Sequence, residues 1–283
     1  MDKLKILVAI HKEAEVFHND IYQPIWAGKA ISKANLQWPG DDIGDEISRK
    51  NRNYSEMTVH YWAWKNLQTE YIGFCHYRRY FSTCFTSKNI ENELRGYDII
   101  LPNAMYFDTP MYEKLCHTFS LEDKDIFLLV LKQKFPFFYK AAIDYLFNNR
   151  KDYAFNMMVC KKTIFDDMMN FVFSVLFECE KYVKISPYTT SSRVFGYYAE
   201  YLVPIYCFAK HLKIREMSLT DMLGTSQQNI ILAPENLKRR IQSKLRFNFI
   251  HPKKTHSYSP DAAVLVGLHN DGIINEKGEL ICH

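Results

Sequence analysis

The sequence predicts an α/β fold, in which a sheet is flanked by helices and the C-terminal part is mainly helical. The first observation is that residues 5–10 and 71–76 form short apolar runs rich in β-branched or aromatic residues, as buried strands do. The second is that residues 53–67, between these runs, carry bulky apolar side chains in a pattern that suits a helix. Strands that alternate with helices along the chain are typical of layered α/β folds.

The other elements are predicted from local patterns. Residues 20–52 are rich in Gly, Pro, Asp and Asn and are expected to form a long folded loop. Asn53 followed by Glu56 resembles a capping box at the start of the helix at 53–67. Apolar spacing predicts helices at 89–95, 121–134, 137–149, 163–182 and 192–211, strands at 97–102, 155–160 and 213–219, and a small hairpin at 272–281. We expect one domain at 1–220 and a separate segment at 221–283.

Composition narrows the class of protein. The chain has 283 residues, of which 47% are hydrophobic, so we expect a packed core. A net charge of +4 is too small for a nucleic-acid coat, and we expect no nucleic-acid partner. The seven cysteines form no C-x-x-C pair and are expected to be reduced thiols of a cytoplasmic protein. We find no signal peptide and no stretch near the roughly 20 apolar residues that span a bilayer.

A cationic and aromatic motif follows the predicted strand at 71–76. His76, Arg78 and Arg79 alternate with tyrosines, and burying an unpaired guanidinium is costly. The motif is therefore either a structural ion-pair node or an anion site, and its place at the end of a strand favours an anion site. His11 and Lys12 follow the first strand, where they would touch a nucleotide or simply be solvated.

Acidic and amide side chains supply candidates for binding hydroxyl groups. Asp41, Asp42 and Asp45 could ligate a divalent cation, bind sugar hydroxyls or act as a base, although such acids also occur in plain exposed loops. Asn51 lies in a polar loop that leads into a helix, where an anion or a sugar can bind.

Five further residues have a structural explanation as well as a functional one. Glu56 would be a helix-capping acid, His117 a core histidine, and Asn156 a polar residue that opens an apolar strand. Arg193 and Glu200 lie seven apart on one predicted helix, so a salt-bridge network is the default for them. Taken together with the cations, these side chains suit a ligand with both an anion and a polyol, as a sugar nucleotide has.

Several common sites are excluded. The sequence has no G-x-G-x-x-G and no G-x-x-x-x-G-K-[ST], so neither a dinucleotide dehydrogenase nor a P-loop kinase is supported. It also has no H-E-x-x-H and no Cys/His spacing for structural zinc. The basic amphipathic segment at 236–254 is either a solvated helix face or a surface that docks on an anionic membrane.

The chain resembles a bacterial family long labelled a domain of unknown function. The family is found in capsular, O-antigen and exopolysaccharide gene clusters, its members are usually regarded as glycosyltransferases, and some are described as galactofuranosyltransferases. The resemblance covers about residues 4–220 and includes Asn51, Glu56, His117, Asn156 and Arg193, which we expect in the donor site. Its longest motifs are Gly40-Asp41-Asp42-Ile43-Gly44-Asp45-Glu46-Ile47-Ser48, Tyr61-Trp62-Ala63-Trp64-Lys65-Asn66 and His76-Tyr77-Arg78-Arg79-Tyr80-Phe81.

The resemblance implies a GT-A-like glycosyltransferase. Such enzymes usually carry Asp-x-Asp at the end of a central strand, which holds a metal and the donor diphosphate. His76, Arg78 and Arg79 stand in that place here, so we expect the cations to stabilise the leaving diphosphate without a required metal, although the acidic loop could still hold Mg²⁺ or Mn²⁺.

The expected reaction moves a sugar from a UDP-linked donor, with UDP-galactofuranose as one candidate, to a hydroxyl of a bacterial surface polysaccharide precursor. His11 and Lys12 would lie near the nucleotide, and Asp41 or Asp45 near the donor sugar or the ribose. Asp42 and Glu200 are the candidate bases. The acceptor is expected to be lipid-linked, which would give 236–254 a peripheral contact with the inner face of the cytoplasmic membrane.

Two other classes of function stay open. One is a sugar-nucleotide or glycan-binding module without catalysis. The other is an enzyme of phosphate chemistry in which His76 is the nucleophile and the arginines clamp the phosphate.

Overall fold

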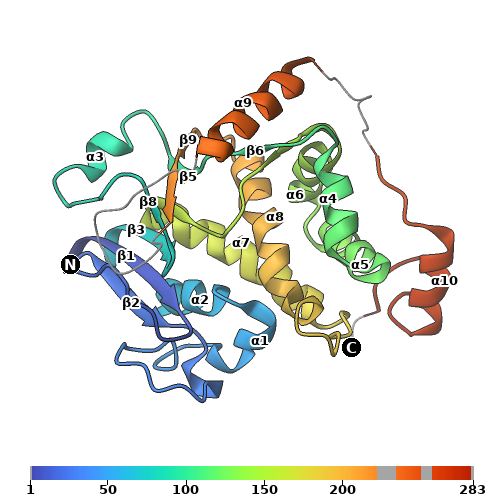
Figure 1. Ribbon diagram of the computed structural model, residues 1–283. Coiled ribbons are helices and arrows are strands. Elements are labelled where there is room, and N and C mark those ends of the chain that lie inside the picture. The colour runs from blue at the N-terminus through green and yellow to red at the C-terminus, as the bar shows by residue number, and fades with distance from the viewer. Residues whose placement is uncertain (1, 222–233, 250–256, 282–283) are drawn as a thin grey trace.

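The computed structural model describes residues 2–221, 234–249 and 257–281 of the chain. A mixed sheet of eight strands lies on one side of the molecule, and a group of helices packs against it and extends beyond it (Figure 1). The α/β fold predicted from the sequence, with a sheet flanked by helices and a mainly helical C-terminal part, is confirmed.

The direction of the strands defines one functional edge of the sheet. Strand β1 pairs in parallel with β2 and β3, β8 is antiparallel to both β3 and β5, and β5 is parallel to β9. The carboxyl ends of β1, β2, β3, β5 and β9 therefore lie along one edge, which we call the carboxyl edge. The strands are β1 (Asp2–Ile10), β2 (Tyr22–Trp26), β3 (Thr69–His76), β4 (Arg79–Phe81), β5 (Ile99–Pro102), β8 (Met158–Lys161), β9 (Ile214–Met217) and β10 (Leu219–Asp221).

Both faces of the sheet are buried, which explains why its central strands are continuous apolar runs. On β1, Leu7 and Ala9 enter a core shared with the helices, whereas Ile6 and Val8 enter a second core on the opposite face. The centre of β3 must be glycine, because a Cβ on Gly73 would lie 2.5 Å from Ile6 Cδ1.

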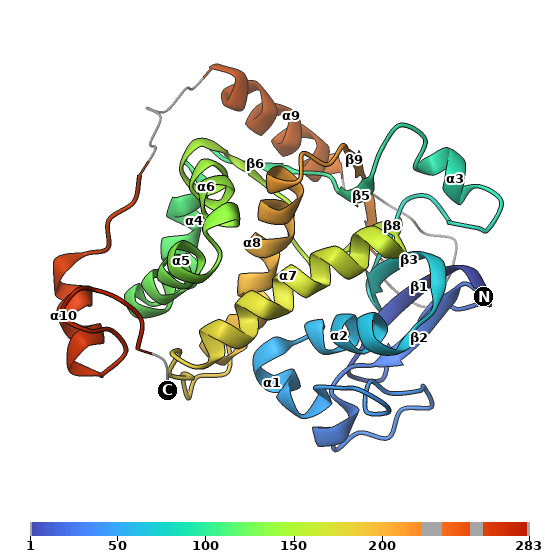
Figure 2. The same ribbon diagram turned by 180° about the vertical axis from the view of Figure 1, so that it is seen from behind.

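The helices form the larger core. Helix α7 packs against β3, α2 and α8, and Figure 2 shows it crossing the centre of the molecule. A small two-stranded sheet of β6 (Met105–Tyr106) and β7 (Lys151–Asp152) lies beyond β5. The helices are α1 (Asn51–Tyr54), α2 (Met57–Asn66), α3 (Ile90–Glu93), α4 (Met111–Thr118), α5 (Leu121–Lys134), α6 (Pro136–Ile143), α7 (Lys162–Glu180), α8 (Val194–Ala209), α9 (Pro234–Phe249) and α10 (Ala262–Asn270).

Three local predictions were wrong. The expected loop at 20–52 contains β2, which the sequence conceals because it includes Pro24; the proline is tolerated because β2 pairs only with β1 at the edge of the sheet. The helix expected at 53–67 is two helices, α1 and α2, separated by Ser55 with φ 52°. Glu56 precedes α2 but its side chain makes no capping hydrogen bond, so the capping box is absent.

The other predicted elements lie close to their predicted positions. Helix α5 has the predicted bounds, and α8 continues through Pro204. The hairpin expected at 272–281 is a single antiparallel bridge between Ile274 and Leu280. The end of the basic segment, 250–254, lies outside the described residues, and the division into 1–220 and 221–283 stays a prediction.

Candidate functional site

The site is built where β1 and β3 end at the carboxyl edge. The register of these strands pairs Ala9 with His76, so the residues that follow each strand emerge side by side. A two-residue turn, Tyr77-Arg78, joins β3 to β4, with His76 paired to Arg79. His11, His76, Arg78 and Arg79 are therefore brought together by backbone topology alone.

The buried ring of Tyr77 is in contact with several basic side chains at this edge. The His11 ring meets it edge-on at 5.3 Å between centroids, and the Arg78 guanidinium and the Lys12 ammonium lie 5.1 Å and 6.0 Å from its centre. Burial and the nearby charges of Lys12, His76, Arg193 and Arg78 lower the pKa of His11. We call His11, Lys12, His76, Arg78, Arg79 and Arg193 the cationic cluster.

Two members of the cationic cluster, Arg78 and Lys12, differ from a structural ion-pair node. Arg78 and Lys12 are exposed, and no carboxylate within the described part of the chain forms a salt bridge with either. The hydroxyl of Tyr77 is buried without a hydrogen-bond partner among the described residues. An edge with exposed cations and an unsatisfied hydroxyl can receive an anion with several acceptor oxygens.

A strained turn at Phe155 and Asn156 borders the cationic cluster. We call this turn, together with the turn at Ser55 and Glu56 that it contacts, the wall of the site. Phe155 and Asn156 have φ values of 80° and 49°, in the left-handed region that side chains with a Cβ disfavour. The Phe155 ring lies 4.2 Å below the Arg79 guanidinium. Its backbone hydrogen-bonds to both His76 and Glu200. Strain that persists at such a junction is typical of a functional site.

Asn156 connects the turn to a carboxylate. Its Nδ2 donates to Glu56 Oε1 at 2.8 Å and to the carbonyl of Gly196 at 3.2 Å, while its buried Oδ1 has no partner in the described structure. A Cβ on Gly196 would lie 3.0 Å from Ser55 Oγ, so glycine allows α8 to approach the turn before α2.

Glu56 is surrounded by a hydrogen-bond donor and by basic side chains. Beside the bond from Asn156, His76 Nε2 lies 4.0 Å from Oε1, and Arg193 lies 3.9 Å from Oε2. The guanidinium of Arg193 also donates to Ser55 Oγ at 2.8 Å. Arg193 thus pairs with Glu56, and the alternative ion pair with Glu200 is not found in the described structure.

Glu200 has a different environment from Glu56. Burial, followed by the negative charge of Glu56, raises the pKa of Glu200 to about 7. A smaller opposing effect comes from Lys114 on α4, which forms a salt bridge with buried Asp152. Burial likewise lowers the pKa of His76. A carboxyl group that titrates near neutral pH next to an anion site can exchange a proton with a bound hydroxyl group.

The acidic loop has mainly a structural role. Asp41 is fully buried and its carboxylate accepts hydrogen bonds from the Gly28 and Lys29 amides and from the hydroxyls of Ser48 and Thr58. It anchors the loop after β2 to the start of α2. No free position for a sugar hydroxyl remains on it.

The other site residues predicted from this region also make contacts within the protein. Asn51 donates to the carbonyl of Ser55 and to Thr58, so it closes the turn between α1 and α2. Asp45 accepts from Tyr61 near the far end of α2, away from the cationic cluster. Asp42 is partly exposed at the carboxyl edge, with Lys29 3.6 Å away and one carboxylate oxygen without a hydrogen-bond partner among the described residues.

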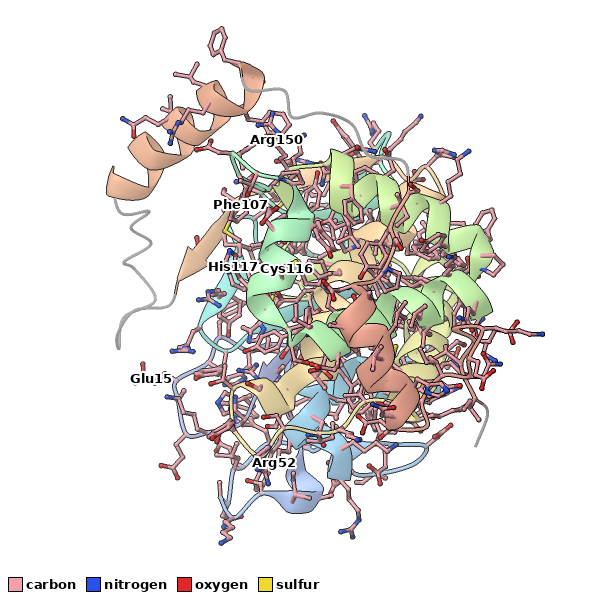
Figure 3. The ribbon with its side chains drawn as sticks, turned by 90° about the vertical axis from the view of Figure 1, so that its right-hand side faces the viewer. Glu15, Arg52, Phe107, Cys116, His117 and Arg150 are labelled. Carbon is pink, nitrogen blue, oxygen red and sulfur yellow. The ribbon has the colours of Figure 1, made fainter. Side chains whose placement is uncertain are left out.

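No contact between His117 and the cationic cluster is found in the described structure, and its place in the donor site stays a prediction. It is exposed on α4, where Figure 3 labels it, and no hydrogen bond of its side chain is found in the described structure. The prediction that it is a satisfied core histidine is wrong, because it lies on the solvent side of a helix whose buried residues are Met111 and Leu115.

His60 is a site residue that the sequence did not reveal. It is buried on α2, stacked on Phe74 at 3.8 Å, and its ring nitrogens face the carbonyl oxygens of Glu56 (3.1 Å) and Asn156 (2.9 Å). His60 therefore connects the turn at Glu56 with the turn at Asn156. A histidine among apolar helix residues gives no sequence signal for such a role.

The described residues include no group of three or more His, Cys, Asp or Glu side chains arranged to hold a metal ion. Metal independence stays a prediction. Among the described helices, none has the length and apolar character needed to cross a bilayer.

Comparisons with known proteins identify a family and a similar fold. The family model described as "Domain of unknown function (DUF4422)" matches residues 5–211. The chain is also similar to a solved structure, the apo form of the bifunctional glycosyltransferase WbbM, with a TM-score of 0.72 and 28% sequence identity. That match covers 82% of this chain and 47% of WbbM, so the chain spans about half the length of its structural relative. Comparison with curated proteins found no match.

Proposed function

This chain belongs to the DUF4422 family, and we propose that it is a glycosyltransferase that moves a sugar from a nucleotide donor to a hydroxyl group. The single observation that carries the proposal is the cationic cluster beside Glu56 and Glu200 at the carboxyl edge. The similarity to WbbM supports the general class of activity. The donor, the acceptor and the residue roles below are parts of the proposal.

The cationic cluster binds the donor diphosphate. Arg78 and Lys12 are exposed cations beside the exposed His11, and the Arg79 guanidinium lies over the Phe155 ring at 4.2 Å from its centre. A UDP-linked sugar, with UDP-galactofuranose as one candidate, would place its two phosphates over these groups. They would stabilise the negative charge that develops on the leaving diphosphate.

The carboxylates act on the sugar and the acceptor. In an inverting reaction, Glu200 takes the proton of the acceptor hydroxyl, whose oxygen forms a bond to the anomeric carbon. The bond from that carbon to the diphosphate breaks, and its electron pair leaves with UDP. The pKa of Glu200, about 7, matches this task at neutral pH. Asp42 is the second candidate base, because it is partly exposed at the same edge.

Glu56 has a positioning role in this scheme. It pairs with Arg193 and lies next to His76, so it orients cations that touch the donor. The acceptor is a lipid-linked precursor of a bacterial surface polysaccharide. This assignment rests on the resemblance to polysaccharide-cluster proteins.

The proposal is tested by nucleotide release from a panel of UDP- and GDP-sugars, with a lipid-linked acceptor analogue, in the presence of Mg²⁺ or EDTA. We expect acceptor-dependent release of UDP that Glu200→Gln abolishes and that the exposed control Glu276→Gln retains. Donor binding without release in any variant would instead indicate a binding module.

His76 as a nucleophile is the competing mechanism, and one observation favours it: burial lowers its pKa, so the nucleophilic neutral imidazole predominates at pH 7. Mass spectrometry after incubation with the donor separates the two. A phosphohistidine at His76 would replace the transferase assignment with phosphate chemistry.

A further inference from the structure

Helix α9 presents an apolar stripe that the described chain leaves uncovered. Ile241, Leu245 and Phe249 recur every four residues, and their side chains are 53%, 53% and 81% exposed. At about 100° per residue, these positions share one face of the helix. Three large apolar side chains aligned on one exposed helix face are a typical interaction surface.

The opposite face of α9 fixes its orientation on the protein. Phe247 packs edge-on against Tyr106 of β6 at 5.1 Å, and the buried Arg150 lies 4.5 Å from the Phe247 ring and donates to its carbonyl at 2.5 Å. Arg246 pairs with Asp108 at 3.0 Å. Figure 3 shows Arg150 next to the helix. The stripe is therefore held outward by specific contacts.

The charge of the helix identifies the surface that it would meet. Its sequence contains the acid Glu235 and the bases Lys238, Arg239, Arg240, Lys244 and Arg246. Apolar side chains combined with basic ones are the pattern of a helix that lies in an anionic membrane interface. Two copies of the chain that met through this stripe would bring two positive helices together, which disfavours a dimer.

The position of α9 relates the stripe to the site. Strand β6 follows the carboxyl end of β5, and β7 leads within three residues to the strained Phe155. Phe247 packs on the residues Arg150 and Lys151. Helix α9 is thus attached to the small sheet that follows the carboxyl end of β5 (Figure 1).

We propose that α9 docks this protein on an anionic lipid surface. Ile241, Leu245 and Phe249 enter the boundary between headgroups and acyl chains, and Lys244, which is exposed on the same helix, contacts a phosphate headgroup. The small sheet that follows the carboxyl end of β5 is then presented to the membrane side. The proposal stands apart from the transferase assignment, because it concerns lipid binding without turnover.

The test is co-sedimentation of the full chain with vesicles of phosphatidylglycerol and phosphatidylcholine, or of phosphatidylcholine alone. We expect binding to the anionic vesicles that weakens with added salt. Replacing Ile241, Leu245 and Phe249 together by serine should lower the partition coefficient at least about tenfold. Phe137→Ser, at an aromatic residue that is 65% exposed on α6, is the matched control and should bind as wild type.

Three results would overturn the proposal. They are no binding to anionic vesicles, equal binding to neutral vesicles, and binding that the triple serine variant retains. Sedimentation velocity is measured in parallel: a dimer that the triple variant dissociates would assign the stripe to a second copy of the chain. Binding of UDP by the same variants shows that they are folded and that the site is intact.

Discussion

Asn156 and Glu56 are joined by a 2.8 Å hydrogen bond from Asn156 Nδ2 to Glu56 Oε1, although 100 residues separate them in the chain. Each residue follows one with positive φ: Ser55 before Glu56, and Phe155 before Asn156. Two strained backbone turns therefore meet at one hydrogen bond. Such turns persist only where the surrounding structure determines them, here through His60, Gly196 and Arg193.

Replacing Asn156 should separate its backbone role from its side-chain role. Its φ of 49° suits glycine better than alanine, so we expect Asn156→Ala to be less stable than Asn156→Gly by about 1 kcal/mol. Both variants lose the bond to Glu56 and should lose activity at least about tenfold. Urea unfolding and nucleotide release measure the two effects. Equal stability of the two variants would contradict the strain assigned to this turn.

Glu200 should control how the rate depends on pH. Because its pKa is about 7, the rate should rise as the pH increases through 7 and level off above it. Glu200→Gln should remove this rise together with most of the activity. A wild-type rate that is flat between pH 6 and 8 would exclude Glu200 as the base.

The same group should make stability depend on pH. The pKa of Glu200 is raised from about 4.5 to about 7 by folding, so the folded state retains a proton that the unfolded chain releases. The contribution of Glu200 to the free energy of unfolding should therefore fall between about pH 4.5 and 7, by up to about 3 kcal/mol. Glu200→Gln should remove that fall and be more stable than wild type at pH 8, but not at pH 4.5. Urea titrations at the two pH values measure the difference.

His60 should act through Glu56 and Asn156. His60→Phe keeps the ring stacked on Phe74 but removes the one N–H with which the neutral imidazole can serve either carbonyl group, at a cost of about 1–3 kcal/mol. The turnover number should fall while the affinity for UDP changes little, because His60 lies behind the wall. His60→Gln, which can restore one hydrogen bond, should recover part of the rate. A variant that loses UDP affinity instead would indicate a general loss of structure.

Burial lowers the pKa of His60, so the unfolded chain binds a proton more readily than the folded one. The contribution of His60 alone should therefore make wild type lose stability as the pH falls below about 6.5, opposite in sign to the contribution of Glu200. His60→Phe should lose less over the same range. Unfolding curves at pH 5 and 7 test the sign.

Asp41 and Asp42 are neighbours with opposite expected effects. Asp41→Asn weakens the bonds to two amides and two hydroxyls in a buried site, so we expect a loss of stability of about 3 kcal/mol. Asp42→Asn should change stability little, since Asp42 is partly exposed, and should affect only turnover. Thermal unfolding of the two variants compares them directly. A destabilised Asp42→Asn beside a neutral Asp41→Asn would reverse the assignment.

The elements that the sequence predicts well are those with strong periodic patterns. Strands β1 and β3 and helix α5 are apolar and locally consistent, and the cationic cluster follows because His11 and His76 end neighbouring parallel strands. Strand β2 is hidden by Pro24, whose effect depends on its place at the sheet edge.

The wall of the site depends on long-range contacts that the sequence does not display. Local signals favour one helix through Ser55, and the interruption there depends on contacts with α8 that form only on folding. Phe155 has no motif, yet its backbone holds His76 and Glu200. Asp41 and Asp42 are adjacent acids that the sequence does not distinguish. In the structure, Asp41 is buried and anchors the loop, whereas Asp42 is partly exposed.

The most direct test of the central claim is calorimetric titration of UDP into the protein and its Arg78→Ala and Arg95→Ala variants, with Mg²⁺ and with EDTA. Arg95 is an exposed arginine beyond α3 and provides the charge-matched control. We predict micromolar binding of UDP that Arg78→Ala weakens at least about tenfold, that Arg95→Ala leaves unchanged, and that does not require the metal. Equal weakening by both variants, or no binding of UDP by wild type, would contradict the assignment of the carboxyl edge as the donor site.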